Sequence, residues 1–375
     1  MNAPQTGAEE APTPITHNLV GQTIEGGWVV KQMLSKPGKP APHSSGGTFS
    51  VTYLCERDGA HAFLKVFDIF SAMQSDNPIE ELGEVIQAYA HESRLIDICR
   101  DAGLNRVVKG ILKHSSQVAD PAYPYMRMPL CYILFETADG GDIRSLMGRK
   151  GQLEVVANLE LLHQVAVGLR QLHGVRIAHQ DLKPSNVVIF ERDKTGAKVA
   201  DLGRASHRDY PAPHDTLAFA GDGLYAPPEQ LYQYVAPEWI DRREACDLYQ
   251  LGSLLCFLFA GEGATSGTIE RMPPEFCPGA WDGSYAEVIP YVQQGFASFI
   301  EDIALDFPEW ARDELVVFVQ HACDPDVHRR GHPKARQQIV DGKVGRIGLD
   351  RFITTLANLA KRAMVQARIE RNAKE

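Results

Sequence analysis

The sequence contains 375 residues, of which 44% are hydrophobic and 23% are charged. This balance excludes a disordered or fibrous chain, and the length suffices for one large domain or two lobes around a cleft. Asp and Glu outnumber Lys and Arg by 48 to 38, which gives a formal net charge of −10. Since no global positive field exists to bind phosphates, we expect no nucleic-acid partner.

The cysteines and the apolar runs indicate the cellular location of the protein. Seven cysteines are scattered along the chain without a C-x-x-C pair, so we expect neither disulfides nor structural zinc. No apolar run approaches the roughly 20 residues that cross a bilayer. The first residues, "MNAPQTGAEEAPTP", lack the charged and apolar regions of a signal peptide. We therefore expect a cytoplasmic protein without a membrane span.

The first part of the chain is predicted to consist mostly of strands. Residues 1–20 are rich in Pro, Ala, Thr and Glu, which is typical of a flexible leader. Residues 26–68 contain short β-branched and aromatic runs separated by Gly, Pro and "RDG", a pattern of antiparallel strands and turns. Residues 78–103 have helical spacing, with Pro78 suited to a first turn. Residues 131–142 are predicted to form a further strand.

The second part is predicted to be mostly helical. Residues 159–174 are apolar at positions i, i+3 and i+4, and residues 246–261 are apolar nearly all round, which indicates a buried helix. Residues 349–375 are predicted to form one amphipathic helix with a basic tip. The stretch 261–310 is interrupted by Gly and Pro and allows no assignment. The predicted organisation is a leader, two lobes and a C-terminal helical extension, at residues 1–20, 21–137, 138–335 and 336–375.

The stretch "IAHQDLKPSNVVIF", residues 177–190, places polar side chains between two apolar runs. A β-hairpin pattern follows and then "DLG", so we expect the chain to return and bring Asp201 beside Asn186. Carboxylate and amide oxygens are donors that Mg²⁺ takes together with phosphate oxygens. Asp181 would face the same spot as a base for a hydroxyl, and Lys183 could neutralise charge on a phosphoryl group. The alternative is that these residues are surface loop polars that cap secondary structure.

This pattern resembles the eukaryotic-type (Hanks-type) serine/threonine protein kinase family over roughly residues 25–335. The catalytic-loop signature H-R-D-L-x-x-x-N appears here as "HQDLKPSN", and the D-F-G motif appears as "DLG". The resemblance implies an α+β, bilobal protein-kinase-like fold, with a small antiparallel β-sheet N-lobe that has one main helix and a larger, mostly helical C-lobe. It also implies ATP and Mg²⁺ as cofactors, catalytic roles for Asp181, Lys183 and Lys65, and metal binding by Asn186 and Asp201.

Further elements of the resemblance concern the nucleotide. "AFLKVF" resembles the strand with the phosphate-binding lysine, here Lys65, and the best candidate for its helix partner is Glu92, with Glu84 a weaker one. "FETADGGD" resembles the hinge segment, which implies Phe135 as gatekeeper. The residues implied to contact the nucleotide are Gly46, Gly47, Lys65, Glu92, Glu136, Ala138, Asp142 and Val188.

Other matches are structural. "GDGLYAPPE", residues 221–229, resembles the end of the activation segment. Asp247 matches the buried aspartate that braces the catalytic loop, and Arg330 in "DPDVHRR" matches the ion-pair partner of Glu229. A group of histidines near Cys323 lacks a recognised metal-binding spacing and is interpreted as incidental. These histidines are His321, His328 and His332.

Two departures from the family pattern concern the nucleotide site. The glycine-rich loop is represented by "SSGGTFSVTY", in which Gly47 is retained while Ser45 and Ser50 replace the outer glycines. A serine Cβ limits the approach of backbone N–H groups to phosphate, so we expect weaker nucleotide binding. Phe63 stands where the family usually has a small alanine over the adenine, and its ring would shrink that pocket.

Two more departures concern control of the reaction. Gln180 replaces the arginine beside the catalytic aspartate. Because glutamine cannot form charge-assisted hydrogen bonds to a phosphate, phosphorylation of Thr216 or another loop residue is not expected to be the main on-switch. Asp222 takes the place of a threonine and is expected to tune Lys183 or to alter the choice of acceptor.

The sequence therefore predicts a serine/threonine protein kinase that transfers the γ-phosphoryl group of ATP to protein substrates. A pseudokinase scaffold with weak or no phosphoryl transfer is the first alternative, supported by Ser45, Ser50 and Phe63. A small-molecule kinase is the second, and Lys183 and the "APPE" segment argue against it. The sequence does not name the protein substrates and leaves autophosphorylation open. The wording "YAPPEQLY" resembles bacterial members of the family.

Overall fold

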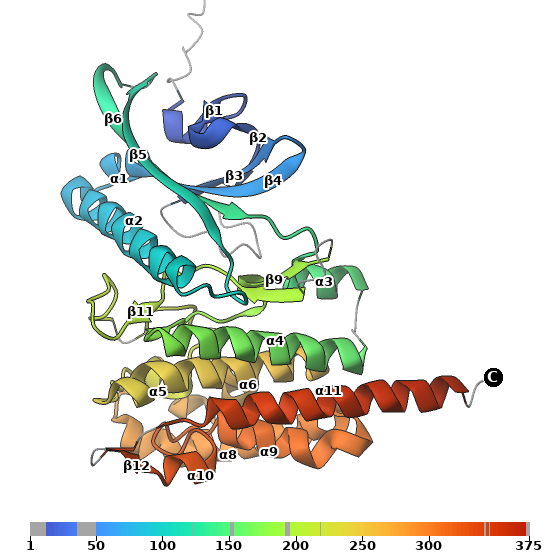
Figure 1. The fold of residues 1–375 in the computed structure, drawn as a ribbon. Coiled ribbons are helices and arrows are strands. Elements are labelled where there is room, and N and C mark those ends of the chain that lie inside the picture. Colours follow the sequence, from blue (N-terminus) through green and yellow to red (C-terminus); the bar gives the residue numbers. More distant parts are fainter. Residues whose placement is uncertain are drawn as a thin grey trace, which may run out of the picture. The chain divides into compact units, whose positions relative to one another are not determined.

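The computed structural model of the chain describes residues 13–35, 50–121, 123–150, 154–191, 196–217, 219–340, 343–344 and 346–372 (Figure 1). The chain divides into two compact units. The first comprises Met1–Ile96 with Lys109–Thr137, and the second comprises Asp97–Val108 with Ala138–Glu375. Within the described ranges, no helix is both long enough and apolar enough to cross a membrane.

The first unit is built on a six-stranded antiparallel sheet with the strand order β1-β2-β3-β4-β6-β5. The strands are β1 Thr23–Ile24, β2 Trp28–Ser35, β3 Ser50–Arg57, β4 Ala60–Phe67, β5 Gly110–Asp120 and β6 Tyr123–Glu136. Its helices are α1 Ile69–Met73 and α2 Pro78–Asp101, of which α2 enters the second unit at Asp97, and short 3₁₀ turns occur at Ile15–His17 and Glu25–Gly27. This small sheet with one main helix confirms the predicted character of the N-lobe.

The turn between β3 and β4 follows directly from the sequence "RDG". Asp58 and Gly59 have φ angles of 51° and 77°, the left-handed conformation that a two-residue hairpin turn requires. The register then pairs Arg57 with Ala60. Along β4 the side chains alternate between the two faces of the sheet. Leu64 belongs to the buried core, and Lys65 lies on the opposite face.

The segment before β1 is part of this core. Ile15 and Leu19 are buried in the same apolar cluster as the sheet. The Tyr53 hydroxyl donates a hydrogen bond to the Thr16 carbonyl oxygen at 2.6 Å. The prediction of a flexible leader through residue 20 is therefore wrong for its last residues, because isolated apolar side chains gave no periodic signal. Residues 1–12 of the predicted leader lie outside the described part of the chain.

The second unit is mostly helical, as predicted for the C-lobe. Its helices are α3 Ile143–Lys150, α4 Val155–Gly174, α5 Pro228–Leu231, α6 Ala245–Ala260, α7 Ala264–Glu270, α8 Tyr285–Ile303, α9 Arg312–Ala322, α10 Pro333–Arg336 and α11 Leu349–Asn372. Its strands are β7 Gly141–Asp142, β8 Ile177–Ala178, β9 Val187–Phe190, β10 Gly196–Val199, β11 Ser206–His207, β12 Ile339–Val340 and β13 Lys343–Val344. Short helical turns occur at Pro184–Asn186, Ile240–Glu244, Pro274–Phe276, Ala304–Asp306 and Glu309–Ala311.

Helix α6 forms the centre of the second unit. Nearly all of its side chains are buried, as its all-round apolar sequence predicted. The stretch 261–310, which allowed no assignment, contains α7 and α8. Helix α8 begins at a capping box in which Glu287 accepts from the Ser284 backbone N–H at 2.8 Å. Pro290 lies inside this helix, and a proline usually indicates a helix end.

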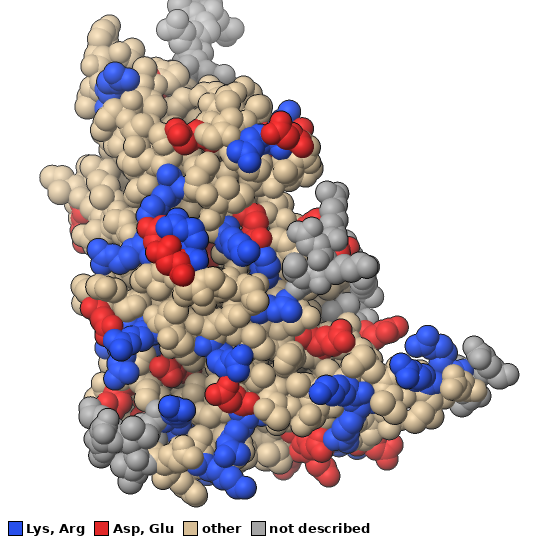
Figure 2. Space-filling model, viewed as in Figure 1, with Lys and Arg blue, Asp and Glu red and all other residues tan. Residues whose placement is uncertain are grey.

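The C-terminal helix α11 lies alongside α4 (Figure 1). It buries Phe352, Leu356 and Leu359, which confirms the predicted amphipathic helix. Its last turns project beyond α4, and Val365 and Ile369 are each 56% exposed there. On the face shown in Figure 2, basic side chains gather on this projecting end, while elsewhere Lys and Arg are interspersed with Asp and Glu.

Candidate active site

The predicted catalytic loop follows β8, and side chains of α6 form hydrogen bonds to its backbone. Asp247 is fully buried, and its carboxylate accepts from the backbone N–H groups of His179 and Gln180 at 2.8 and 2.7 Å. The Gln250 side chain accepts from the Leu182 N–H at 2.9 Å and donates to the Gln180 carbonyl at 3.0 Å. The bracing role predicted for Asp247 is thus present in the geometry. The role of Gln250 was not predicted, although a polar residue in an apolar helix was a usable signal.

The polar side chains of the loop converge on Asp181. Its carboxylate lies 3.2 Å from Lys183 Nζ and accepts from Asn186 Nδ2 at 3.0 Å. Burial raises the pKa of Asp181 and the charge of Asp201 raises it further, while Lys183 opposes the shift. A carboxylate with a raised pKa, held by a lysine and an amide, is well suited to accept a proton.

The predicted hairpin is present, and it places the two candidate metal ligands together. Strands β9 and β10 pair with Val187 opposite Val199. The Ala200 N–H then donates to the Asn186 carbonyl at 2.8 Å, so Asp201 comes next to Asn186. Asp201 has a φ of 63°, a strained conformation that is typical of functional positions.

These two residues fit a divalent cation by their chemistry. Asn186 uses its Nδ2 group for both the backbone carbonyl and the side chain of Asp181, which leaves its amide oxygen facing elsewhere. An amide oxygen and one carboxylate are a small ligand set. Such a set suits Mg²⁺, which keeps waters and takes substrate phosphate oxygens. Within the described residues, no group of three or more His, Cys, Asp or Glu side chains could hold a metal by itself.

The end of the segment 201–229 approaches the catalytic loop closely. The Asp222 N–H donates to Asp181 Oδ1 at 2.9 Å, and its carboxylate lies 3.4 Å from Lys183 Nζ. A Cβ on Gly221 would lie 2.4 Å from the Gln180 carbonyl oxygen and 2.8 Å from Asp181 Oδ1. Only glycine permits this approach. Asp222 therefore contacts both Asp181 and Lys183, and the effect predicted for it on Lys183 or on acceptor choice stays a prediction.

A buried ion pair fixes the far end of this segment. Arg330 Nη1 and Nη2 donate to the two carboxylate oxygens of Glu229 at 2.8 and 2.6 Å. Arg330 is completely buried and its guanidinium lies over the Tyr249 ring. Burial alone would lower the pKa of Arg330, but the charge and hydrogen bonds of Glu229 outweigh it and raise the pKa. The geometry is the one the sequence predicted for this pair.

In the first unit, the predicted lysine and glutamate meet. Lys65 Nζ lies 2.9 and 3.1 Å from the two carboxylate oxygens of Glu92. Glu92 is 1% exposed, whereas the weaker candidate Glu84 is exposed. The helix α2 therefore presents Glu92 to β4, and the preferred pairing of the sequence analysis is the one formed.

The face of the sheet that carries Lys65 also carries two phenyl rings. Phe63 pairs with Phe135 across β4 and β6, and their ring centroids are 6.4 Å apart. Phe63 thus lies on the face where its effect on an adenine pocket was expected. The predicted phosphate-loop residues Gly46 and Gly47, with Ser45, lie outside the described part of the chain.

The other predicted nucleotide contacts fall at the end of β6 and in the small sheet of the second unit. Glu136 exchanges hydrogen bonds with the backbone of Lys109. Asp142 pairs with Val188 across β7 and β9, and Asp142 also caps α3 by accepting from the Ser145 N–H at 2.7 Å. The capping role is the ordinary structural use of an aspartate at this position. Ala138 is the first residue of the second unit after Thr137.

Comparison with known families adds to this geometry. A family model described as "Protein kinase domain" matches residues 107–274, slightly less than half of the chain. The matched range contains the catalytic loop, the "DLG" motif and the segment up to Glu229. It begins after Lys65 and Glu92.

Named relatives agree with this match. The chain is 29% identical over 163 residues to the calcium and calcium/calmodulin-dependent serine/threonine-protein kinase of Oryza sativa subsp. japonica, covering 42% of this chain and 29% of that protein. It is 26% identical over 146 residues to serine/threonine-protein kinase RAD53 of Saccharomyces cerevisiae, covering 37% and 18%. It is 28% identical over 156 residues to serine/threonine-protein kinase PknA of Mycobacterium tuberculosis, covering 39% and 34%. Over residues 107–274 the chain is therefore similar to protein kinase domains, and its named relatives are serine/threonine-protein kinases.

The chain aligns with only part of each of these relatives. The aligned segments span between 18% and 34% of the three proteins. The domains that make up the rest of those proteins therefore say nothing of this chain.

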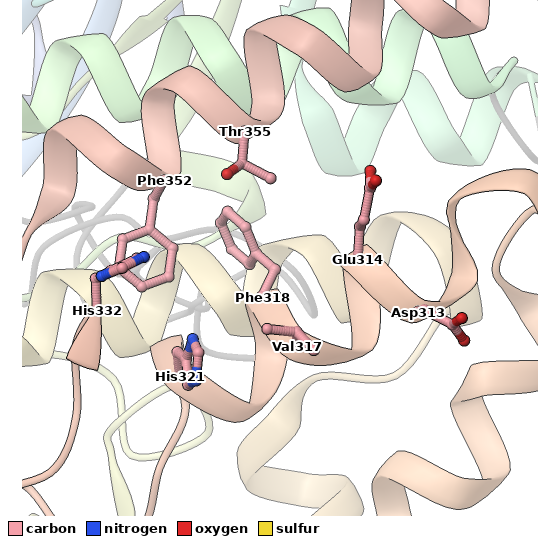
Figure 3. A pocket seen from close by; sticks show the side chains of 8 residues that line it. All are labelled: Asp313, Glu314, Val317, Phe318, His321, His332, Phe352 and Thr355. Carbon is pink, nitrogen blue, oxygen red and sulfur yellow. The ribbon is translucent and has the colours of Figure 1, made fainter. Parts of the chain in front are cut away.

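A pocket of about 310 Å³ lies elsewhere in the second unit (Figure 3). Its side chains come from α9, from α11 and from His332. None of the predicted site residues lines it. His321 and His332 contribute to its wall, whereas His328 pairs with Asp241. The rings of His321 and His332 lie against each other, with centroids 6.1 Å apart.

The second unit also contains a hydrogen-bond network that the sequence did not reveal. Gln180 accepts a hydrogen bond from the buried Arg243, which in turn donates to Asp215 Oδ1 at 2.8 Å. The three residues are far apart in the sequence and follow no spacing rule, so no sequence signal was available.

Proposed function

We propose that the chain transfers the γ-phosphoryl group of ATP to Ser and Thr hydroxyls of protein substrates. The observation that carries this proposal is the position of Asp181, between the Lys183 ammonium and the Asn186 amide, with the Asp222 N–H on its other oxygen. This arrangement holds one carboxylate in a fixed orientation beside a positive charge. Positioning and electrostatics of this kind account for most of the catalysis of phosphoryl transfer.

Asp181 is assigned the role of proton acceptor. The hydroxyl oxygen of the acceptor residue forms a bond to the γ-phosphorus, the bond from phosphorus to the β–γ bridging oxygen breaks, and ADP leaves. The hydroxyl proton passes to Asp181, whose raised pKa favours its acceptance. Lys183 stabilises the negative charge that spreads over the transferred oxygens.

Asn186 and Asp201 would hold Mg²⁺ through the amide oxygen and the carboxylate. When bound, the ion neutralises charge on the phosphate oxygens. In the first unit, Lys65 is assigned to phosphate oxygens of ATP, and Glu92 keeps its ammonium oriented and charged.

The proposed acceptors are proteins. The named relatives are all described as serine/threonine-protein kinases, and this chain has Lys183 two residues after Asp181, the form that resembles serine/threonine specificity. Glu229 and Arg330 anchor the segment that would support a polypeptide acceptor. We also assign the protein to the cytoplasm, because ATP is its proposed substrate and all seven cysteines are free thiols.

A scaffold without phosphoryl transfer is the second candidate, and Phe63 favours it. Its ring lies on the same sheet face as Lys65 and next to Phe135, where it competes for space with an adenine. Under this alternative, the ordered site would serve partner binding and nucleotide would bind weakly or not at all.

One experiment separates the two candidates. The chain is incubated with ATP, Mg²⁺ and a generic acceptor protein such as casein, and phosphorylated residues are mapped by mass spectrometry. We expect phosphate on Ser and Thr, absent in Asp181→Ala and in Asp201→Ala. Absence of phosphate with wild type would contradict the proposal. A Phe63→Ala variant that then binds ATP, measured by thermal shift, would establish that the ring closes the pocket.

A further inference from the structure

We propose that Asp215 is a fixed anion of the activation segment, residues 201–229, and that it holds this segment on the catalytic loop through Arg243 and Gln180 without any phosphate. The inference rests on the proposed function, because it concerns how the site of that reaction is kept in its working arrangement. All residues of this network belong to the second unit.

Arg243 is the cation of the network. It lies in the short helical turn Ile240–Glu244 and is 2% exposed. A charge buried to this degree requires a partner of opposite sign. Its Nη2 donates to Asp215 Oδ1 at 2.8 Å, and its Nη1 donates to Gln180 Oε1. Both terminal nitrogens are therefore engaged inside the protein.

The Asp215 carboxylate accepts hydrogen bonds from other residues of the activation segment. Its Oδ1 also accepts from the Ser206 hydroxyl at 2.9 Å, and its Oδ2 accepts from the Ala212 N–H at 2.7 Å. Arg242 donates to its backbone carbonyl. A phosphate that orders such a segment does so by pairing with arginine and accepting several hydrogen bonds. The Asp215 carboxylate already makes contacts of this kind.

Gln180 transmits this arrangement to the catalytic loop. Its Nε2 donates to the Ser206 hydroxyl at 2.7 Å and to the Arg204 carbonyl at 3.2 Å. Its backbone N–H is fixed by Asp247, and the next residue is Asp181. With a φ of 62°, Gln180 is held in a conformation that needs such support. The segment, the arginine and the loop therefore form one continuous set of contacts.

The network explains why a glutamine suits position 180. An arginine at position 180 would place a second guanidinium against that of Arg243. The two groups have the same charge, and neither can accept a hydrogen bond from the other. The pairing with Asp215 already provides the charge of Arg243 with a partner of opposite sign. Thr216 is exposed beside Asp215, so a phosphate on it would add negative charge next to an existing carboxylate, which is unfavourable.

The test starts from phosphatase-treated protein, with casein as the acceptor and kcat and KM measured separately. Wild type and Thr216→Ala should keep their kcat without phosphate. Asp215→Asn preserves shape but removes the charge, and we expect its kcat to fall at least about tenfold while KM for ATP stays unchanged, because positioning of the loop is lost. Gln180→Arg, which restores the usual family residue, should lower kcat in the same way.

Control variants separate positioning from general damage. Asp209→Asn removes an exposed carboxylate of the same segment, which pairs with the exposed Arg176, and should leave kcat unchanged. The double variant Asp215→Asn with Arg243→Gln should be no worse than the more damaging single variant, since both remove one interaction. Melting temperatures verify that each variant is folded. Full additivity of the two losses would contradict the shared network.

Two results would overturn the inference: full kcat in Asp215→Asn, or a phosphatase-treated wild type that loses its activity and regains it on incubation with ATP. Failure of the proposed function is recognised separately, because wild type would then transfer no phosphate in any state. Hydrogen exchange in residues 204–217 still decides the structural claim in that case. Faster exchange in Asp215→Ala than in wild type would support the role of Asp215, and equal exchange would overturn it.

Discussion

Lys65 and Glu92 form a two-point ion pair in which one ammonium lies 2.9 and 3.1 Å from the two oxygens of one carboxylate. The pair links β4 to α2 within the first unit. The Glu92 side chain is almost fully buried, and that of Lys65 is 13% exposed. An ion pair with this burial orients its members much more strictly than one on the surface.

Lys65→Met should reduce phosphoryl transfer by about 10² or more, as the loss of one preorganised donor does in other active sites. Glu92→Gln should have a smaller effect in the same direction, because the ammonium remains but is less well oriented. Lys31→Met is the matched control. Lys31 lies in the same sheet and forms an exposed pair with Glu56, so its loss should not change the rate. Equal rates for Lys65→Met and Lys31→Met would contradict the assignment.

Gly221→Ala should lower kcat by about 10², since a shift of the reacting groups by 1 Å costs this much. The added Cβ would meet the Gln180 carbonyl and the Asp181 carboxylate at 2.4 and 2.8 Å, so both must move. Gly223→Ala, two residues later, has its nearest contacts at 3.9 Å and should be tolerated. Steady-state kinetics of the two variants check this, and similar kcat values would argue against the close approach.

Arg330→Met should lower the free energy of unfolding by about 3–5 kcal/mol, because it leaves the Glu229 carboxylate buried without its partner. Arg362→Met provides the comparison. Arg362 and Glu314 also form an ion pair, but their side chains are 47% and 51% exposed, and such surface pairs contribute at most about 1 kcal/mol. Urea unfolding followed by circular dichroism measures both. An equal decrease in the free energy of unfolding for the two variants would contradict the importance of the buried ion pair.

His173 predicts a specific pH dependence of stability. Burial disfavours its charge, but the hydrogen bond and charge of Asp247, with the charge of Glu244, outweigh burial and raise the pKa of His173. The pKa of His173 in the folded protein exceeds the unfolded value of about 6.5. The contribution of protonated His173 to the free energy of unfolding is therefore complete below about pH 6.5. It is lost as the pH rises through the folded pKa.

The measurement compares wild type with His173→Gln by urea unfolding at several pH values from 6 upward. The difference in the free energy of unfolding should shrink as the pH rises. His163, His321 and His332 have pKa values lowered chiefly by burial, and their contributions cancel in this comparison. A difference that stays constant or grows with pH would refute the raised pKa.

The geometry of the loop at residues 177–190 and of the hairpin that follows it was largely predictable from the sequence. The order from His179 through Asp201 combines a fixed residue spacing with a hairpin pattern, and both are local features. The hairpin then determines that Asn186 and Asp201 meet. Helix α6 was also predicted, because an apolar run of that length is too long for an ordinary strand and indicates a buried helix.

Other features depend on contacts that have no local signature. The β5 strand was not predicted, because residues such as His114 and Gln117 interrupt its apolar alternation. The network of Asp215 and Arg243 joins residues 28 positions apart. Burial of Ile15 and Leu19 depends on the finished sheet. Such contacts arise only when the tertiary fold forms.

The most direct test of the account is the initial rate of label transfer from radiolabelled ATP to casein in the presence of Mg²⁺, for wild type, Asp181→Asn and Asp209→Asn. The account predicts label on Ser or Thr for wild type and for Asp209→Asn, and a loss of about 10² or more for Asp181→Asn, the size expected for a missing general base. No transfer by wild type, or an Asp181→Asn rate equal to that of wild type, would contradict it.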